Sequence, residues 1–383
     1  MKLIFLYRII QKGQSQSILL TPSSLLRIDG FRHRMVDFVL KQFYCKTKVR
    51  EGEIIVNSFK AVRVKEQEDQ VIYGLEEVTA DQLSEGDVLI KVAYSSINYK
   101  DMLAVQKNSG VIRNYPMIPG IDLSGIVVES TDSRFTEGQE VIVTGFTMGM
   151  SHTGGFSEYA RVPADWIVPM PDNLSLKDAM VFGTAGFTAA LSILALEKSG
   201  MDVSDNPEIL VTGSTGGVGS IALQIFSKIG YTNVSALVRK EHQAEVAKSL
   251  GAATVIFADE LGDSKKPLGK TRFDYVLDTV GGDVTSALIP QISYGGSMSM
   301  CGNAGGLQVN TTVLPFILRG VSLLGVDSVN VPIEKRGSIW EKMASEWNIT
   351  QTTLTNEIFL EELTETIDAI KNGQHLGRTI VKL

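Results

Sequence analysis

The chain has 383 residues, of which 44% are hydrophobic and 21% are charged, so it can bury a large core, and this length is typical of two domains. A net charge of -7 gives no general attraction to nucleic acid or to an anionic membrane, so any phosphate must be bound by a local site. The two cysteines, Cys45 and Cys301, exclude a disulfide framework and predict a reducing compartment, the cytoplasm.

Residues 1–55 stand apart, because their short apolar pieces follow neither helical nor alternating periodicity. Arg8 interrupts the first apolar run and no small-residue cleavage site follows, so we predict no signal peptide. Two interpretations of this atypical extension stay open. It is either a real, mostly disordered segment, or untranslated DNA read as protein, because Arg50-Glu51-Gly52-Glu53 is what a purine-rich ribosome-binding sequence would encode.

From Ser58 to about residue 182, short strands are bounded by Gly, Pro, Asp and Asn. The predicted strands cover residues 59–64, 88–92, 125–129, 140–144 and 159–162. This pattern predicts a compact, barrel-like, β-rich domain. No stretch reaches the roughly 18 uninterrupted apolar residues that a membrane span needs, so we predict a soluble chain with no membrane partner.

After Gly183 the pattern changes to alternating helices and strands, which is typical of a parallel, doubly wound sheet. A helix at 186–198 leads into a strand at 209–212, and the further strands are predicted at 233–238, 254–257, 273–278, 296–301 and 321–326. A helical segment at 360–370 and a strand at 379–381 return to the first domain. We therefore predict an α/β protein with a β-rich domain at 56–185 and 340–383 and a doubly wound domain at 186–339.

The strongest local signal is a glycine-rich turn between an apolar strand and an amphipathic helix, Val211-Thr212-Gly213-Ser214-Thr215-Gly216-Gly217-Val218-Gly219. In such a turn, backbone amides can approach a pyrophosphate, here those of Ser214, Thr215, Gly216, Gly217 and Val218. Gly219 would permit close packing of the helix on the strand. A glycine cluster by itself is a weak motif, but its place in a strand-turn-helix-strand unit predicts dinucleotide binding.

The end of the next strand decides which dinucleotide is bound, because an acidic residue there holds a ribose 2'-hydroxyl and a basic one holds a 2'-phosphate. The chain has Arg239 and Lys240 at this point, which favours NADPH. The alternative is a solvated strand end with Glu241 as the ribose ligand.

Metal ligands are scarce in the sequence. The four histidines, His33, His152, His242 and His375, are scattered, and there is no cysteine cluster, so we predict no zinc site. His152 is interpreted as a loop residue. Without a metal to polarise an alcohol, alcohol oxidation is a poor prediction, whereas an electrophilic alkene can be reduced without a metal.

Several motifs occur in order from about residue 58 onward. They are Asn98-Tyr99-Lys100-Asp101, Pro116-Met117-Ile118-Pro119-Gly120-Ile121-Asp122, Gly183-Thr184-Ala185-Gly186-Phe187-Thr188-Ala189, the Gly213 to Gly219 turn, Pro315-Phe316-Ile317-Leu318-Arg319, Gly325-Val326-Asp327-Ser328-Val329 and Gly377-Arg378-Thr379. With these motifs the chain resembles the YhdH-type quinone oxidoreductase, or acryloyl-CoA reductase, branch of the medium-chain dehydrogenase/reductase superfamily. The resemblance implies a GroES-like catalytic domain, a Rossmann domain, a cleft between them, NADPH as hydride donor and a homodimer. It also implies that Tyr99 lies by the nicotinamide and that Asn303, Asp327 and Arg378 lie near the cofactor.

The chemistry that follows is hydride transfer to the β-carbon of an unsaturated carbonyl compound and protonation at the α-carbon, which requires orientation of two reactants and stabilisation of an oxyanion. Asn98 and Tyr99 offer amide and phenol donors, and the alternative is that they cap a loop and pack. Lys100 and Asp101 are either a proton-relay pair or an exposed ion pair. Thr184 is a candidate for cofactor contact, whereas Asp122 is interpreted as a structural anchor.

Three functions remain open from the sequence. The first is reduction of an enoyl thioester such as acryloyl-CoA, and the second is reduction of a quinone or enone. The third is an NADPH-binding protein with little turnover, against which the complete set of residues around Asn98 argues.

Overall fold

The structure is a computed structural model that describes strands at 5–11, 14–20, 47–50 and 53–56 and then residues 58–68, 70–262, 266–350, 354–373 and 375–383. The chain forms two compact units, Met1–Ser58 and Phe59–Leu383. In the first unit, β1 (Phe5–Gln11) pairs antiparallel with β2 (Gln14–Leu20), and β3 (Thr47–Arg50) pairs antiparallel with β4 (Glu53–Val56). The hypotheses about the origin of residues 1–55, and Cys45 with them, fall largely outside the described residues.

The first part of the second unit is built on a seven-stranded sheet with the order β11-β9-β8-β7-β19-β18, and β10 also pairs with β7. We call it the mixed sheet, because β18 and β19 are parallel and the other pairs are antiparallel. The strands are β7 (Val88–Ser96), β8 (Asp122–Ser130), β9 (Glu140–Thr144), β10 (Tyr159–Val162), β11 (Ile167–Pro169), β18 (Thr355–Phe359) and β19 (Arg378–Lys382). A separate hairpin joins β5 (Phe59–Gln67) to β6 (Gln70–Val78).

These elements confirm the predicted β-rich domain. The alternating side chains of β7, Val88, Ile90 and Val92, are buried in one apolar cluster with Leu123 and Val127 of β8, as a two-residue period requires. β8 begins earlier than predicted, at Asp122, which places that carboxylate inside the sheet.

The second part is built on a six-stranded sheet with the order β14-β13-β12-β15-β16-β17, in which every pair is parallel. We call it the parallel sheet. Its strands are β12 (Ile209–Val211), β13 (Val234–Val238), β14 (Thr254–Phe257), β15 (Phe273–Asp278), β16 (Ile292–Met300) and β17 (Ser322–Gly325). Ile209 and Val211 pack into one apolar cluster and Leu210 into another, so β12 is covered on both faces. The predicted doubly wound sheet is confirmed.

Helices cover both sheets. The α-helices are α2 (Tyr99–Ala104), α3 (Leu176–Lys198), α4 (Gly217–Lys228), α5 (His242–Ser249), α6 (Gly282–Leu288), α7 (Leu314–Arg319), α8 (Ile333–Ala344) and α9 (Leu363–Lys371). The short 3-10 helices are η1 (Ala80–Gln82), η2 (Ala164–Trp166), η3 (Val203–Asp205), η4 (Ala258–Leu261), η5 (Ile289–Gln291) and η6 (Leu360–Glu362). The predicted domain boundary at residue 340 falls within α8.

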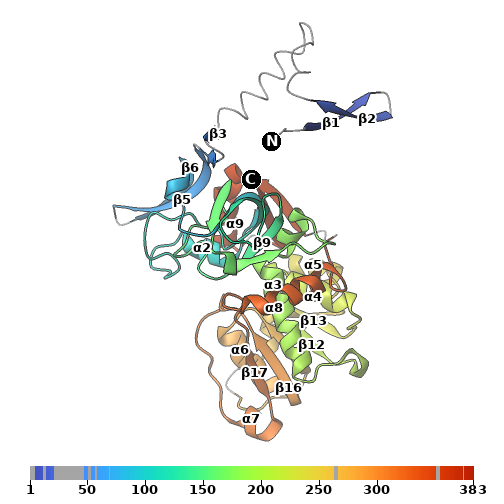
Figure 1. Cartoon of the computed structure of the whole chain (residues 1–383). Helices are drawn as coiled ribbons and strands as arrows, with labels where there is room; N and C mark the ends of the chain where they lie inside the picture. The colour runs from blue at the N-terminus through green and yellow to red at the C-terminus, as the bar shows by residue number, and fades with distance from the viewer. Residues whose placement is uncertain are drawn as a thin grey trace. The chain divides into compact units, whose positions relative to one another are not determined.

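Helix α3 joins the two parts. It is longer than the predicted helix at 186–198, and its backbone leaves the helical conformation at Gly183, where φ is 51° and ψ is -156°. By length and composition α3 could cross a membrane, but 83% of its most apolar window is buried inside the protein. With α8 it lies between the part that carries β9 and the part that carries β12 and β16 (Figure 1).

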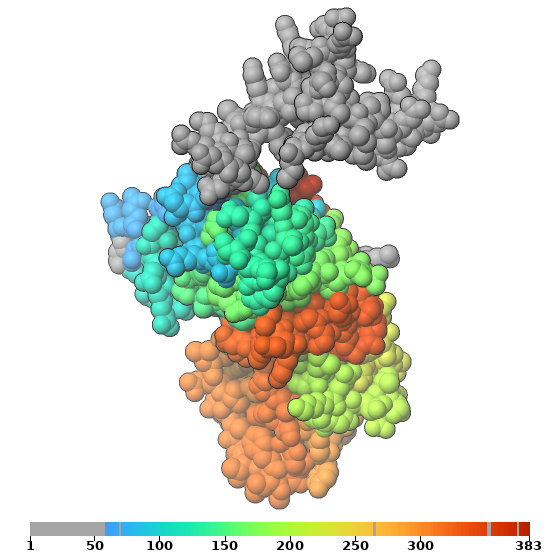
Figure 2. All heavy atoms as spheres, in the orientation of Figure 1, coloured from blue at the N-terminus to red at the C-terminus, as the bar shows by residue number. Residues whose placement is uncertain are grey.

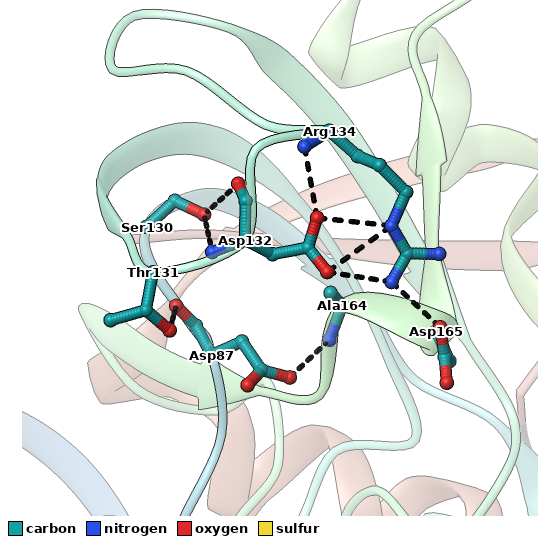
Figure 3. Close-up of polar contacts among 7 residues, drawn as sticks. All are labelled: Asp87, Ser130, Thr131, Asp132, Arg134, Ala164 and Asp165. Carbon is teal, nitrogen blue, oxygen red and sulfur yellow. Dashed lines mark hydrogen bonds and ion pairs between the residues drawn. The ribbon is translucent and has the colours of Figure 1, made fainter.

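A polar cluster fixes one surface loop of the mixed-sheet part (Figure 3). The carboxylate of Asp132 accepts hydrogen bonds from the Arg134 guanidinium, with Nη2 at 2.8 Å, and from the Arg134 amide at 2.9 Å. These bonds lower the pKa of Asp132 to about 2. The same guanidinium reaches Asp165 Oδ1 at 2.7 Å, so the cluster ties the loop after β8 to η2 and contains none of the predicted site residues.

Candidate active site

The glycine-rich turn lies between β12 and α4, as predicted. Gly213 has a φ of 55°, a conformation that favours glycine, and a Cβ there would lie 2.3 Å from Thr279 Oγ1. A Cβ on Gly219 would lie 2.4 Å from the carbonyl oxygen of Gly213. The prediction that Gly219 permits close packing of the helix on the strand is therefore confirmed.

The start of α4 is the part of this turn that could hold an anion. Gly216 is the N-cap of the helix, and Gly216, Gly217 and Val218 are half-buried. The first backbone amides of a helix have no acceptor within it, and the helix dipole adds positive potential at this end. The turn can therefore present its amides to a phosphate group.

Ser214 and Thr215, two hydroxyl residues of the turn, are buried. Ser214 Oγ donates a hydrogen bond to the carbonyl oxygen of Leu237 at 2.8 Å, and the carbonyl of Thr215 accepts one from the amide of Gly377 at 2.9 Å. The Ser214 hydroxyl thus joins the turn to β13. Any contact that Ser214 makes with a cofactor would have to come from its backbone.

A second glycine segment packs directly on the first. A Cβ on Gly302 would lie 1.9 Å from the carbonyl oxygen of Thr279, the residue whose hydroxyl blocks a side chain on Gly213. This close approach places the exposed Asn303 at the same edge of the parallel sheet as the glycine-rich turn.

Asp278 supports this edge from beneath and was not predicted. It is fully buried at the end of β15, and its carboxylate accepts hydrogen bonds from the hydroxyls of Thr212, at 2.6 Å, and Thr285. It also accepts from the amide of Val280 at 3.1 Å. A carboxylate directly after the apolar run Tyr275-Val276-Leu277 and three residues before Gly281-Gly282 is the sequence signal that could have identified it.

Asp122 is the centre of the junction between the two parts of the unit. Its side chain is fully buried, and Oδ2 accepts hydrogen bonds from Ser96 Oγ at 2.7 Å and from the backbone amide of Thr184 at 2.9 Å. The Nδ2 of Asn98 donates to the same oxygen at 2.9 Å. One carboxylate therefore holds the loop before α2 and the bend of α3, which agrees with its interpretation as a structural anchor.

Arg378 lies beside this carboxylate and is 2% exposed. Its Nε donates to the carbonyl of Val181 at 3.0 Å, Nη2 to Ser96 Oγ at 2.6 Å, and Nη1 to the carbonyl of Ile97 at 3.1 Å. Burial lowers the pKa of Arg378, and the negative charges of Asp122 and Asp101 oppose that shift.

The expectation that Arg378 lies near the cofactor stays a prediction. Its guanidinium already donates hydrogen bonds to carbonyl and hydroxyl acceptors within the protein. A Cβ on Gly217 would nevertheless lie 3.4 Å from Arg378 Nη1 and 3.5 Å from the Cβ of Ala185. Arg378 therefore lies next to the start of α4 and can support that turn.

The side chain of Asn98 is also hydrogen-bonded within the protein. It is the N-cap of α2 and is 8% exposed, and its amide group donates to Asp122 and to the carbonyl of Ser96 at 3.2 Å. Its Oδ1 accepts from Arg378 at 3.4 Å. The capping interpretation therefore fits Asn98 better than direct contact with a substrate.

Asp101 is neither an exposed ion pair nor placed as a relay partner for Lys100. Its carboxylate is fully buried and accepts hydrogen bonds from the amides of Asn98, at 2.8 Å, and Ile121, at 3.1 Å. Burial, with the negative charge of Asp122, raises the pKa of Asp101 to about 7, although the two amides oppose the shift. Asp101 thus shapes the loop that carries Asn98 and Tyr99.

Tyr99 and Lys100 keep free head groups on α2. Tyr99 is 46% exposed, and among the described residues neither phenol nor ammonium has a hydrogen-bonding or ion-pair partner. Burial alone would raise the pKa of the exposed Asp327, but hydrogen bonds from Asn330 and Val329, together with the charge of Lys100, lower it. Lys100 and Asp327 therefore lie near each other across the junction.

Thr184 has an unpartnered hydroxyl. It follows the bend of α3 at Gly183 and is 7% exposed. Its amide and carbonyl are bonded to Asp122 and Thr188, but its Oγ1 is buried with no hydrogen-bond partner. A buried hydroxyl without a partner is unfavourable, so Thr184, beside Ala185 and the start of α4, stays a candidate for contact with a cofactor.

Arg239 and Lys240 follow β13, and both are exposed. Their backbone amides donate to Gln243 Oε1 at 3.0 and 3.1 Å. In the described part of the chain no carboxylate forms an ion pair with either side chain. Both cations are thus free to neutralise a phosphate.

Metal and thiol chemistry have little support in the described residues. No group of three or more His, Cys, Asp or Glu side chains in them could hold a metal ion. His152 lies in the loop after β9, with its ring nitrogens 3.0 Å from the carbonyls of Thr153 and Glu85, so its interpretation as a loop residue is confirmed. Burial raises the pKa of the Cys301 thiol to about 12, which disfavours a reactive thiolate.

Two family models match the chain. Residues 84–172 match the alcohol dehydrogenase GroES-like domain, and residues 217–345 match the family described as zinc-binding dehydrogenase. The first match covers β7 to β11 of the mixed sheet, and the second covers β13 to β17 of the parallel sheet. The prediction of a GroES-like domain joined to a Rossmann domain is confirmed.

Three relatives are similar over almost their whole length. YhfP of Bacillus subtilis (strain 168), named as a quinone oxidoreductase, is 46% identical over 85% of this chain and 99% of its own, and its structure, solved with NAD bound, matches with a TM-score of 0.82. YhdH of Escherichia coli K-12, solved with NADPH bound, is 44% identical over 84% of this chain and 99% of its own, with a TM-score of 0.81. Acrylyl-CoA reductase AcuI of Ruegeria pomeroyi is 39% identical over 80% of this chain and 93% of its own.

The identity to these proteins, together with the shared GroES-like and Rossmann folds, confirms the resemblance seen in the motifs. The chain belongs to the YhdH-type quinone oxidoreductase and acryloyl-CoA reductase branch of the medium-chain dehydrogenase/reductase family.

Proposed function

We propose that the protein is an oxidoreductase that uses NADPH to reduce an activated carbon-carbon double bond, with an enoyl thioester such as acryloyl-CoA as substrate. The observation that carries the proposal is the meeting of three features around Arg378. The start of α4 abuts Ala185, the adjacent Thr184 hydroxyl has no partner, and the exposed Tyr99 follows Asn98, which is bonded to Arg378. The names of the three relatives and the NADPH bound to YhdH support it, whereas YhfP was solved with NAD.

NADPH fits the residues present. The amides at the start of α4 would hold its pyrophosphate, Arg239 and Lys240 its 2'-phosphate, and Thr184 its nicotinamide half. Asn303 and Asp327, exposed at the same junction, would lie near it. Bound NADPH supplies a hydride for the β-carbon of an unsaturated carbonyl compound, whose α-carbon then takes a proton.

The protein must orient the substrate and stabilise the negative charge that develops on its carbonyl oxygen. Tyr99 is the donor available for that oxygen, since its phenol is exposed and free of other partners. Lys100 is the nearest free cation on the same helix and adds positive potential. Asn98 and Asp101 act on the reaction indirectly, because they fix the backbone from which Tyr99 projects.

Turnover of two substrates tests the reaction. The full chain would be mixed with NADPH and either acryloyl-CoA or a simple benzoquinone, and absorbance at 340 nm would be followed with and without EDTA. Rapid, chelator-insensitive oxidation with acryloyl-CoA is expected. Reaction with the quinone alone would replace the enoyl thioester by a quinone or enone, and tight NADPH binding without either reaction would favour a binding protein.

Replacement of Tyr99 tests its assigned role. Removal of one oxyanion donor reduces kcat by roughly 100-fold or more in enzymes where it has been measured, so Tyr99→Phe is expected to reduce kcat to that extent with little change in NADPH affinity. Tyr94→Phe, on β7 of the mixed sheet, is a matched control and should keep its activity. Equal activity of Tyr99→Phe and the unaltered protein would remove the phenol from the mechanism.

The nucleotide preference depends on the two cations after β13. The double variant Arg239→Gln with Lys240→Gln is expected to raise the KM for NADPH by roughly 10- to 100-fold and to leave the KM for NADH nearly unchanged, because only NADPH carries the 2'-phosphate. Lys198→Gln, at the end of α3, is the control. A parallel rise for both nucleotides would mean that Glu241 or the glycine-rich turn decides the preference.

We also propose that the protein is a homodimer in the cytoplasm. β17 is the edge strand of the parallel sheet, and the exposed apolar side chains near it are Tyr294, Leu307, Val313, Ile317 and Leu318, which are 55 to 84% exposed. An open sheet edge beside an apolar patch can pair with a second copy. Ile317→Glu should convert the dimer to a monomer in analytical ultracentrifugation, whereas Val203→Glu, on η3, should not.

A further inference from the structure

Arg336 of α8 is a fully buried arginine without a salt bridge. Its side chain has 0% exposure, and within the described residues no carboxylate lies within ion-pair distance of it. Its guanidinium is stacked between two aromatic rings, 4.4 Å from the centroid of Phe146 and 5.0 Å from that of Phe187. Burial lowers the pKa of Arg336 only to about 10, so the group is still charged at neutral pH.

A buried charge is retained only where many hydrogen bonds compensate for the lost water. Arg336 has five such bonds. Nη1 donates to the carbonyl oxygen of Thr144 at 2.8 Å and to its Oγ1 at 2.9 Å. On the other side, Nη2 donates to the carbonyls of Ser328, at 3.2 Å, and Val329, at 2.8 Å, and Nε donates to that of Val331 at 2.9 Å.

These acceptors belong to different parts of the molecule. Thr144 ends β9 of the mixed sheet, whereas residues 328–331 follow β17 of the parallel sheet. Helix α8 crosses the surface between the two parts, where Figure 2 shows it as an orange-red band. One side chain thus joins the catalytic part to the nucleotide-binding part.

The backbone at this contact is shaped to let the segments approach. The amide of Phe146 donates to the carbonyl of Val329 at 2.9 Å. Gly145 and Phe146 both have positive φ values, 77° and 53°, and a Cβ on Gly145 would lie 2.9 Å from the Val329 oxygen and 3.2 Å from Arg336 Nη2. A strained non-glycine residue here indicates that the surrounding structure holds the contact in place.

The segment that Arg336 holds carries predicted site residues. Asp327 begins it and accepts hydrogen bonds from the amides of Val329, at 2.8 Å, and Asn330, at 3.3 Å. Ser328 Oγ lies 2.8 Å from the hydroxyl of Thr188, one turn of α3 beyond Thr184. Any shift of residues 327–331 away from β9 would therefore move Asp327 relative to Lys100 and Thr184.

We propose that Arg336 is a positioning residue that clamps residues 327–331 to the end of β9 and so holds Asp327 in place relative to Lys100 and Thr184. The inference rests on the proposed function only for the identity of the nucleotide.

Arg336→Lys tests the clamp, because lysine keeps the charge but cannot donate to Thr144 and to Val329 and Val331 at once. Arg272→Lys is the matched control. Arg272 also donates to a backbone carbonyl, that of Glu260, and lies 5.2 Å from the ring centroid of Phe273, but all these contacts are within the parallel-sheet part. Thr144→Val removes a single acceptor and keeps the arginine, and it provides a milder test if Arg336→Lys does not fold.

Three quantities would be measured for each variant: amide hydrogen exchange of peptides covering Phe146 and Val329 without nucleotide, the Kd for NADPH, and Tm. For Arg336→Lys we expect exchange at both peptides to rise by about tenfold or more, the Kd for NADPH to rise by a similar factor, and added NADPH to restore protection. Thr144→Val should shift both quantities in the same direction by less. Arg272→Lys should lower Tm alone.

A lower Tm for Arg336→Lys with an unchanged Kd for NADPH would show that the residue only stabilises the fold and would overturn the proposal. Unchanged exchange at Phe146 and Val329 would overturn it as well. Hydrogen exchange and the Kd for NADPH can both be measured without turnover. If the unaltered protein reduced neither acryloyl-CoA nor a quinone, that result would count against the proposed function, and the clamp would still be tested by hydrogen exchange.

Discussion

The backbone amide of Thr184 donates a hydrogen bond of 2.9 Å to Oδ2 of Asp122, although 62 residues separate them. The same oxygen holds Asn98, so a single buried atom fixes both the bend of α3 and the loop before α2. Neither Asp122 nor Asn98 needs to touch a substrate to control where Tyr99 and the Thr184 hydroxyl lie.

Asp122→Asn should therefore impair stability and catalysis together. An amide has one acceptor oxygen, so some of the donors from Ser96, Asn98 and Thr184 lose their partner and Arg378 loses a neighbouring negative charge. We expect the free energy of unfolding in urea to fall by about 3 kcal/mol, within the range for a disrupted buried charge network. Asp165→Asn, which removes an exposed partner of Arg134, should behave like the unaltered protein.

The stability of the protein should depend on pH through Asp101. The pKa of its buried carboxyl is raised from 3.8 to about 7, so between these values the native state binds a proton more tightly than the unfolded state does. Stability from this group is therefore present at low pH and is lost as the pH rises from about 4 to 7, with a slope of at most about 1.4 kcal/mol per pH unit.

Asp101→Asn should remove this slope from the profile of unfolding free energy against pH. It should also lower stability at pH 5, because the amides of Asn98 and Ile121 donate to different oxygens of Asp101, and one of them would then face an NH2 group that cannot accept. Asp259→Asn, which removes an exposed carboxylate from η4, is the control. An unchanged slope in Asp101→Asn would mean that another group titrates in this window.

Thr184 offers a prediction in which stability and binding change in opposite directions. Thr184→Val removes a buried hydroxyl that has no partner, so the protein without nucleotide should be as stable as before or more stable by about 1 kcal/mol. If the hydroxyl contacts bound NADPH, the Kd for NADPH should rise by roughly tenfold. Thr184→Ser keeps the hydroxyl and should retain the affinity; weak binding by both variants would assign the effect to the methyl group.

Gly219→Ala should weaken NADPH binding by displacing the start of α4. Its Cβ would lie 2.4 Å from the carbonyl of Gly213, and backbone cannot move aside as a flexible side chain can. We expect the Kd for NADPH to rise by more than about tenfold. Gly337→Ala is the matched control, because no atom lies within 4 Å of its added Cβ and alanine favours the helix, so binding should stay the same.

Much of the fold could be predicted because buried strands appear in the sequence as short apolar runs that end at Gly, Pro or Asp. The strands at 140–144 and 159–162 were predicted at their exact bounds. The start of α3 was not, because Gly183 reads as a boundary, whereas in the structure the helix bends there and continues on both sides.

The site could be predicted only in part, because sequence does not show which polar side chains are already bonded within the protein. Arg378 and Arg239 both lie at the ends of strands, yet the first is buried through contacts with a loop 281 residues away and the second is exposed. Arg336 was missed, although a signal was present. It lies between Ile333 and Trp340 on the apolar stripe of α8, where a charge is out of place.

The pairing of β19 with β7 has a consequence for how the protein is made. Arg378 and the strand that it begins leave the ribosome long after β7 and β8, so the mixed sheet lacks an interior strand during most of synthesis. The parallel sheet, by contrast, is complete once β17 has emerged. The nucleotide-binding part can therefore fold while translation continues. The buried carboxylate of Asp122, by contrast, gains the neighbouring positive charge of Arg378 only after residue 378 has been added to the growing chain.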